Sequence, residues 1–173
     1  MITGEQLSII MPNAHDRVAA FLVPLTSAMQ EFGINTAQRQ SAFLAQIAHE
    51  SGELRYTQEI ADGSAYEGRA DLGNVQVGDG KRFKGHGLIQ ITGRTNHARC
   101  GAALGLNLES FPDLICQPIG AARSAAWFWT DRKLNDDADC DRFGSITHKI
   151  NGGYNGLDAR LIYWLNARKA LQV

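Results

Sequence analysis

One acidic side chain, Glu50, stands where its surroundings in the sequence favour a protonated carboxyl group at neutral pH. Thr36 is a typical helix N-cap, and Phe43, Ile47 and Glu50 then recur on one helix face before Gly52 ends the helix. Desolvation by the apolar stripe and the negative helix end both disfavour a charged Glu50. A protonated glutamic acid is the general acid that glycosidic bond cleavage needs. The alternative is a glutamate that simply points into solvent.

A glycosidase also needs a second group, either a carboxylate that activates water or a nucleophile. The polar stretch after Glu50 offers five acids, among which spacing alone does not choose: Glu53, Glu59, Asp62, Glu67 and Asp71. Gln90 and Thr92 can hold an N-acetyl group, a sugar hydroxyl or a catalytic water, although ordinary half-exposed strand residues would look the same. Asn151, beside two glycines, is a third polar candidate that a helix end explains equally well.

Other catalytic chemistries lack the residues that they require. His49 and Glu50 begin like the metalloprotease motif HExxH, but the second histidine is replaced by Glu53. The segment GDGKRFKGHG is no phosphate-binding loop, and no GxSxG motif is present. Neither the remaining histidines nor the three cysteines have metal-ligand spacing. We therefore expect no metal, no cofactor and no disulfide framework, with one optional bridge left open.

Length and composition predict one globular catalytic domain that spans residues 1–173. Hydrophobic residues make up 44% of the chain, and apolar stripes at helical spacing dominate it. The stretch at about 53–87 is polar, glycine-rich and poorly periodic, which predicts a loop-rich insertion. Residues 88–92 place Leu88, Gln90 and Thr92 on one face and Ile89 and Ile91 on the other, which predicts a short strand.

Charge and hydropathy exclude several classes of partner. The net charge of −1 provides no global field to hold nucleic acid or an anionic membrane. No apolar run is long enough to span a bilayer, so we expect no membrane insertion. The N-terminal MITGEQLSIIMPNA lacks the features of a secretory signal, which favours a protein that folds in a reducing cytoplasm.

Three sequence blocks resemble glycoside hydrolase family 19, which contains chitinases and phage or prophage endolysins. They are FLAQIAHES (43–51), GHGLIQITGRTNH (85–97) and INGGYNG (150–156). Together they cover roughly residues 36–165. The intervening YEGRADLGN (66–74) and the compact length look like the endolysin branch rather than the plant-type chitinases.

The resemblance implies a mainly α, lysozyme-like, two-lobed helical fold, with a short strand or small β element lining the cleft. It implies an endolysin that cleaves β-1,4 glycosidic bonds of bacterial peptidoglycan by an inverting acid/base mechanism. The protein would act as a monomer and would stay in the host cytoplasm until its release to the cell wall. Three alternatives remain open: a chitinase, a lytic transglycosylase and a non-catalytic wall-binding module.

Individual residues also take their roles from this resemblance. The catalytic residues it implies are Glu50, Glu59 and Thr92, and the substrate-binding residues are Gln90, Asn151, Glu67 and Arg69. Glu50 matches the general acid, and Thr92 would help to place the water. Glu59 fits the endolysin pattern best as the second acid, and Glu67 is the other candidate for that role.

Overall fold

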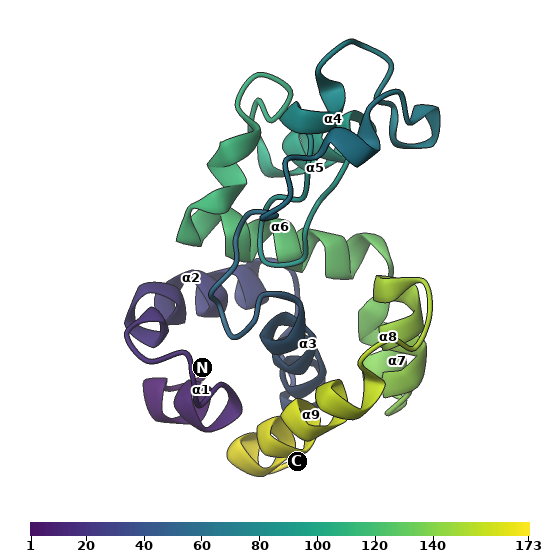
Figure 1. The fold of residues 1–173 in the computed structure, drawn as a ribbon. Coiled ribbons are helices and arrows are strands. Elements are labelled where there is room, and N and C mark those ends of the chain that lie inside the picture. Colours follow the sequence, from purple (N-terminus) through teal and green to yellow (C-terminus); the bar gives the residue numbers. More distant parts are fainter.

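The computed structural model describes all residues 1–173, and Figure 1 shows that the chain is mainly helical. The α-helices are α1 (Gly4–Ile10), α2 (Arg17–Glu31), α3 (Ala37–Glu50), α4 (Asp79–Arg82), α5 (Arg94–Leu104), α6 (Pro118–Asp131), α7 (Leu134–Ala138), α8 (Phe143–Asn151) and α9 (Leu157–Leu171). Three short 3-10 helices complete the set: η1 (Ser64–Tyr66), η2 (Ala70–Leu72) and η3 (Pro112–Cys116). None of the helices is both long and apolar enough to cross a membrane.

The helices form two groups, with α6 running between them (Figure 1). One group contains α1, α2, α3, α7, α8 and α9, and the other contains α4, α5 and the loops around them. Helix α3 packs against α9, and α2 packs against α6. Every residue from position 41 to position 48 of α3 is buried, so this helix forms the centre of its group. Phe43 meets Trp129 of α6 edge to face, with ring centroids 5.4 Å apart.

Local sequence signals set most of the helix ends. Thr3 forms a capping box with Gln6 at the start of α1, and Thr36 accepts a hydrogen bond from the Arg39 amide at the start of α3. Pro118 occupies the first turn of α6. Pro24 lies inside α2, which continues as one helix from Arg17 to Glu31 although a proline there lacks the amide of the helix ladder.

The strand predicted over residues 88–92 is wrong in detail. His86 pairs with Ile91 and with Gln58 through isolated antiparallel bridges, and the residues between His86 and Ile91 form a turn. Gly87 and Gln90 both have positive φ, 81° and 57°, which extended strands do not allow. The apolar residues of this segment are all buried, so they do not alternate between two faces: Leu88, Ile89 and Ile91. What remains is a small β element.

The stretch 53–87 contains only short elements, namely η1, η2 and the four-residue helix α4. Side chains therefore fix much of its path. Both oxygens of Glu67 accept backbone hydrogen bonds, from Gly78 at 2.7 Å and from Gly80 at 2.8 Å. Asn74 is fully buried and donates to the carbonyl of Tyr66. The turn residues of this stretch are thus held by polar contacts in place of a repeating helix ladder.

Candidate active site

Glu50 is the last residue of α3, and its side chain is 19% exposed. Its Oε1 atom is buried and lies 2.6 Å from Nη2 of Arg160, whose side chain is 1% exposed. The two atoms are close but are not aligned as a hydrogen bond, so the contact is an ion pair. The positive charge of Arg160 therefore lies directly against the Glu50 carboxyl group.

Arg160 is held by three elements of the fold. Its Nη1 donates to Oε1 of Gln46 one turn before Glu50, and its Nε donates to the Asn155 carbonyl at 3.3 Å. The Gln46 amide in turn donates to the Thr147 hydroxyl of α8 at 2.8 Å. A continuous polar network therefore joins α3, α8 and α9 beneath Glu50 and fixes the position of its carboxylate.

The loop before α9 approaches the same end of α3. Gly156 has a φ of 72°, and a Cβ atom there would lie 2.5 Å from Cε1 of His49. A glycine is required because the backbone is left-handed and the imidazole ring fills the space of a side chain. Burial and the nearby Arg160 lower the pKa of His49, so the ring beside Glu50 is neutral at pH 7.

Glu59 lies in the other group of elements, and both of its carboxylate oxygens accept hydrogen bonds. Tyr66 donates to Oε1 at 3.0 Å, and the Gly85 amide donates to Oε2 at 2.9 Å. Burial and the Glu59 carboxylate raise the pKa of Tyr66, so the phenol keeps its proton and remains a donor. Each donor uses one lone pair of a carboxylate oxygen, and the remaining lone pairs can still accept from a water molecule.

Gln90 lies next to a residue that binds this carboxylate, and Thr92 contacts Gln90. A Cβ atom on Gly85 would lie 2.3 Å from Oε1 of Gln90, so the Gln90 side chain covers the residue whose amide binds Glu59. The Gln90 amide donates to the Gly87 carbonyl at 3.0 Å, and the Thr92 hydroxyl donates to the Gln90 carbonyl at 3.1 Å. Both side chains are only partly buried and line a cavity of about 190 Å³.

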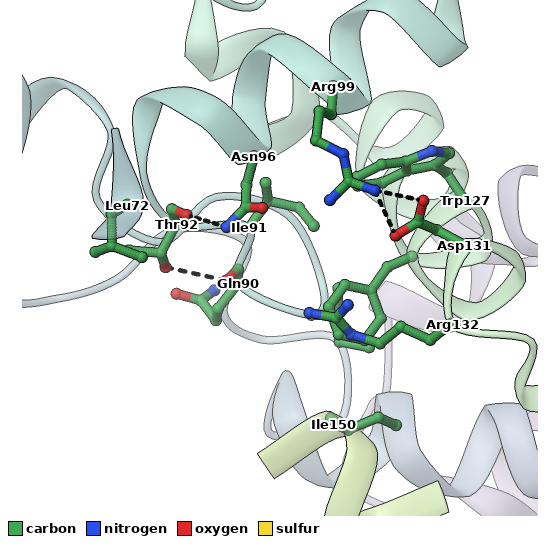
Figure 2. Close-up of a pocket in the computed structure, with 12 residues that line it drawn as sticks. Leu72, Gln90, Ile91, Thr92, Asn96, Arg99, Trp127, Asp131, Arg132 and Ile150 are labelled. Carbon is green, nitrogen blue, oxygen red and sulfur yellow. Dashed lines mark hydrogen bonds and ion pairs between the residues drawn. The ribbon is translucent and has the colours of Figure 1, made fainter. Parts of the chain in front are cut away.

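Figure 2 shows the opposite wall of this cavity, which comes from α5, α6 and α8. This wall contains Arg99, Trp127, Phe128, Asp131, Arg132 and Ile150, whereas Asn96 lies beside Thr92 and donates to its carbonyl at 2.8 Å. Arg99 binds both carboxylate oxygens of Asp131, at 2.7 and 3.0 Å. The guanidinium of Arg132 lies over the Phe128 ring, 3.9 Å from its centroid. The cavity is smaller than the roughly 300–1,000 Å³ of a whole small-molecule site, so it can hold one part of a polymer.

The structure brings together only some of the residues that the sequence singled out. Asn151 is exposed at the end of α8, directly after Ile150, which lines the cavity. Both carboxylate oxygens of Glu67 accept hydrogen bonds from backbone amides, and Arg69 is exposed and forms an ion pair with Asp71 at 2.6 Å. Neither Glu67 nor Arg69 lines the cavity, and neither do Glu50 and Glu59. Sequence reasoning missed four side chains that shape the site: Arg160, Tyr66, Arg99 and Arg132.

The chain matches known proteins over most of its length. The family model of glycosyl hydrolase family 19, described as chitinase class I, matches residues 18–143. A Haemophilus influenzae protein described as containing a glycosyl hydrolase family 19 domain is 28% identical over 92% of each chain. Endochitinase At2g43620 of Arabidopsis thaliana is 35% identical over 89% of this chain. This chain spans only 55% of the length of that endochitinase.

Solved chitinases share the fold. Chitinase C from Streptomyces griseus superposes with a TM-score of 0.82 at 23% identity, covering 99% of this chain and 77% of that one. A class IV chitinase from Zea mays gives a TM-score of 0.73 at 25% identity, covering 95% of this chain and 85% of that one. The prediction of a mainly α, lysozyme-like fold is therefore confirmed. With its family match over residues 18–143, the chain belongs to glycoside hydrolase family 19.

Proposed function

We propose that this glycoside hydrolase is an endolysin that cleaves β-1,4 glycosidic bonds of bacterial peptidoglycan by an inverting mechanism. The observation that carries this choice of substrate is the arginine pair Arg99 and Arg132 on the wall of the cavity. Chitin is a neutral polymer, whereas the peptide stems of peptidoglycan carry carboxylates. A guanidinium group beside the polar residues Gln90 and Thr92 suits a glycan with anionic substituents.

Arg132 is the better candidate of the two for contact with such a carboxylate. Arg99 already binds both oxygens of Asp131, whereas Arg132 has no carboxylate within 4.0 Å. Stacking on Phe128 holds the Arg132 guanidinium at the cavity while its N–H groups stay open to a ligand. Arg132 therefore offers an uncompensated positive charge at the cavity.

Glu50 would serve as the general acid. Its Oε1 is buried against Arg160, which leaves Oε2 as the oxygen that would carry the proton to the departing glycosidic oxygen. Glu59, held in place by hydrogen bonds from Tyr66 and the Gly85 amide, would accept a proton from the attacking water. Thr92 would help to position that water.

A chitinase is the second candidate, and the similarity to endochitinases of Arabidopsis thaliana favours it. The side chains of Gln90, Thr92 and Asn96 at the cavity suit N-acetyl and hydroxyl groups, which both polymers carry. These residues suit both polymers, so the preference for peptidoglycan over chitin depends on Arg132.

The test compares purified wild-type protein with Glu50→Gln on isolated peptidoglycan and on chitin oligomers, with products read by mass and by a reducing-end assay. We expect new reducing ends from peptidoglycan that the variant does not produce. Products with a 1,6-anhydro ring would identify a lytic transglycosylase instead. Cleavage of chitin alone would identify a chitinase, and cleavage of neither polymer would identify a wall-binding module.

The choice of substrate is tested separately with Arg132→Gln. We expect kcat/KM to fall about threefold to tenfold on peptidoglycan and to stay unchanged on chitin oligomers, because a partly exposed charge contact contributes about 1 kcal/mol. Arg168→Gln is the matched control, since Arg168 also lies over an aromatic ring, that of Trp164, but does not line the cavity. An equal loss on both substrates would refute the role of Arg132.

The endolysin role also carries a proposal about where the protein acts. We propose that it is a monomer held in the host cytoplasm and that it reaches the wall only after the membrane is opened. Expression in a bacterial host should then leave the cells intact until a pore-forming agent is added. Lysis without such an agent would contradict this part of the proposal.

A further inference from the structure

A second cluster of side chains that can bind a ligand lies between η3 and the loop before α5. His86 is 1% exposed, and its Nδ1 lies 3.0 Å from Nε2 of His97. Its Nε2 lies 3.2 Å from Oδ1 of Asp113. The ligand atoms of His86, Asp113 and Cys116 all lie within 4.8 Å of one another. None of these residues takes part in the reaction proposed above.

Hydrogen-bond partners determine which ring nitrogens carry protons. Nδ1 of His97 lies 2.9 Å from the Gly93 carbonyl, which can only accept, so this nitrogen carries a proton. His97 is fully buried, which favours the neutral ring, and its Nε2 is then an acceptor. The proton between the two rings consequently belongs to Nδ1 of His86. In the neutral ring this leaves a lone pair on Nε2 of His86, facing the Asp113 carboxylate, whose Oδ1 also accepts from the Gln58 amide at 3.1 Å.

A lone pair and a carboxylate oxygen at 3.2 Å repel each other unless a positive species lies between them. We propose that His86, Asp113 and Cys116 bind one divalent metal ion of the zinc class. Bonds of about 2.0–2.1 Å to nitrogen and oxygen at a tetrahedral angle place the two ligand atoms roughly 3.3 Å apart. The observed separation of 3.2 Å matches this geometry for the nitrogen–oxygen pair, and the Cys116 sulfur lies within 4.8 Å of both atoms. A thiolate completes a nitrogen, oxygen and sulfur set, which favours zinc over calcium or magnesium.

The charges of the cluster suit a divalent ion better than a proton. Once the ion has displaced the thiol proton, a carboxylate and a thiolate supply two negative charges, which balance a dication. Three cations line the adjoining pocket: Lys81 lies near Asp62, whereas Arg82 binds the carbonyls of Glu109 and Ser110 and Lys84 binds the carbonyl of Ala61. That pocket contains no hydrophobic residue, so the fourth position of a tetrahedral ion can take a water molecule.

Metal binding would act on stability, because the ligands come from separate segments. Asp113 and Cys116 belong to η3, whereas His86 pairs through its backbone with Ile91, between Gln90 and Thr92. An ion held by both segments ties η3 to the loop that carries these polar residues. Ligands that bind only the folded state raise the free energy of unfolding.

The test uses chelator-treated, untagged full-length protein, kept reduced with a phosphine, and adds Zn²⁺ in a calorimeter or Co²⁺ in a spectrophotometer. We expect one ion per chain, with the near-ultraviolet absorption of a thiolate–Co²⁺ bond and the visible bands of tetrahedral cobalt. Zn²⁺ at about a hundredfold excess over its dissociation constant should raise Tm by roughly 5–10 °C.

Ligand variants and matched controls separate this site from adventitious binding. Asp113→Asn, at a side chain that is 76% exposed, and Cys116→Ser should each weaken metal affinity about tenfold or more. Cys140→Ser and Asp158→Asn change exposed residues elsewhere and should bind the ion like the wild type. The proposal is overturned by the absence of saturable binding, by unchanged affinity in the ligand variants or by an equal loss in the controls.

Discussion

Replacing Arg160 by methionine removes the positive charge beneath Glu50 and keeps most of the side-chain volume. The change breaks the 2.6 Å ion pair and leaves Oε1 of Gln46, a fully buried residue, without its donor. Breaking a buried ion pair by removing one partner destabilises a protein by about 3–5 kcal/mol, since the other charge stays uncompensated. Glu50 keeps 19% exposure, so we expect the lower end, about 3 kcal/mol.

Urea unfolding followed by circular dichroism measures this loss, and a thermal scan should show Tm lowered by roughly 6–12 °C for a chain of this size. The double variant Glu50→Gln/Arg160→Met separates the ion pair from simple packing. Because it leaves no buried charge unpaired, we expect its loss of stability to fall below the sum of the single losses by about 1–3 kcal/mol. Additive losses, or a loss below about 1 kcal/mol for Arg160→Met, would refute the ion pair as the main contribution.

Three other changes test further parts of the structure. Gly156→Ala should lower the free energy of unfolding by about 1–3 kcal/mol in urea titrations, because φ is 72° and the new methyl group meets His49. Tyr66→Phe removes one of two donors to Glu59, so kcat on the cleaved polymer should fall about threefold to tenfold, and much less than in Glu59→Gln. Burial raises the pKa of Cys100 from 9.0 to about 12. The neutral thiol therefore makes its whole contribution to the free energy of unfolding below pH 9, and this contribution is lost as pH rises through 12. By pH 10 the wild type should have lost roughly 1.4 kcal/mol of unfolding free energy in this way. The urea midpoints of the wild type and of Cys100→Ala, which has no thiol to titrate, should therefore move closer together as the pH rises.

Helix positions were predictable from the sequence wherever a local signal fixes them. Thr3, Thr36 and Pro118 act within one turn of the helix that they begin, so the residues themselves carry the information. Residues 88–92 were not predictable in this way. Their alternation is typical of a strand, but Gln90 adopts a positive φ that few non-glycine residues adopt, and packing imposes it.

The residues of the candidate site also differ in whether a local signal in the sequence marks them. Glu50 could be singled out from the sequence because its helix, its apolar neighbours and the helix end are all local. Glu59 could not be chosen from spacing, because its donors Tyr66 and Gly85 act through the folded loop. The histidine spacing likewise gave no sign of a metal site, since the cluster joins His86 to residues of η3 about thirty positions away.

Arg160 did leave a signal in the sequence that periodicity analysis can recognise. It lies three residues after Leu157 and four before Trp164, so it occupies the core-facing stripe of α9, where an arginine is costly unless an anion pairs with it. Glu50 is the matching anomaly, a carboxylate at the end of the apolar stripe of α3. Two buried charges of opposite sign on packed helices stabilise each other, whereas either one alone would destabilise the core. The pairing of Glu50 with Arg160 therefore follows from the two stripes once α3 and α9 are known to be neighbours.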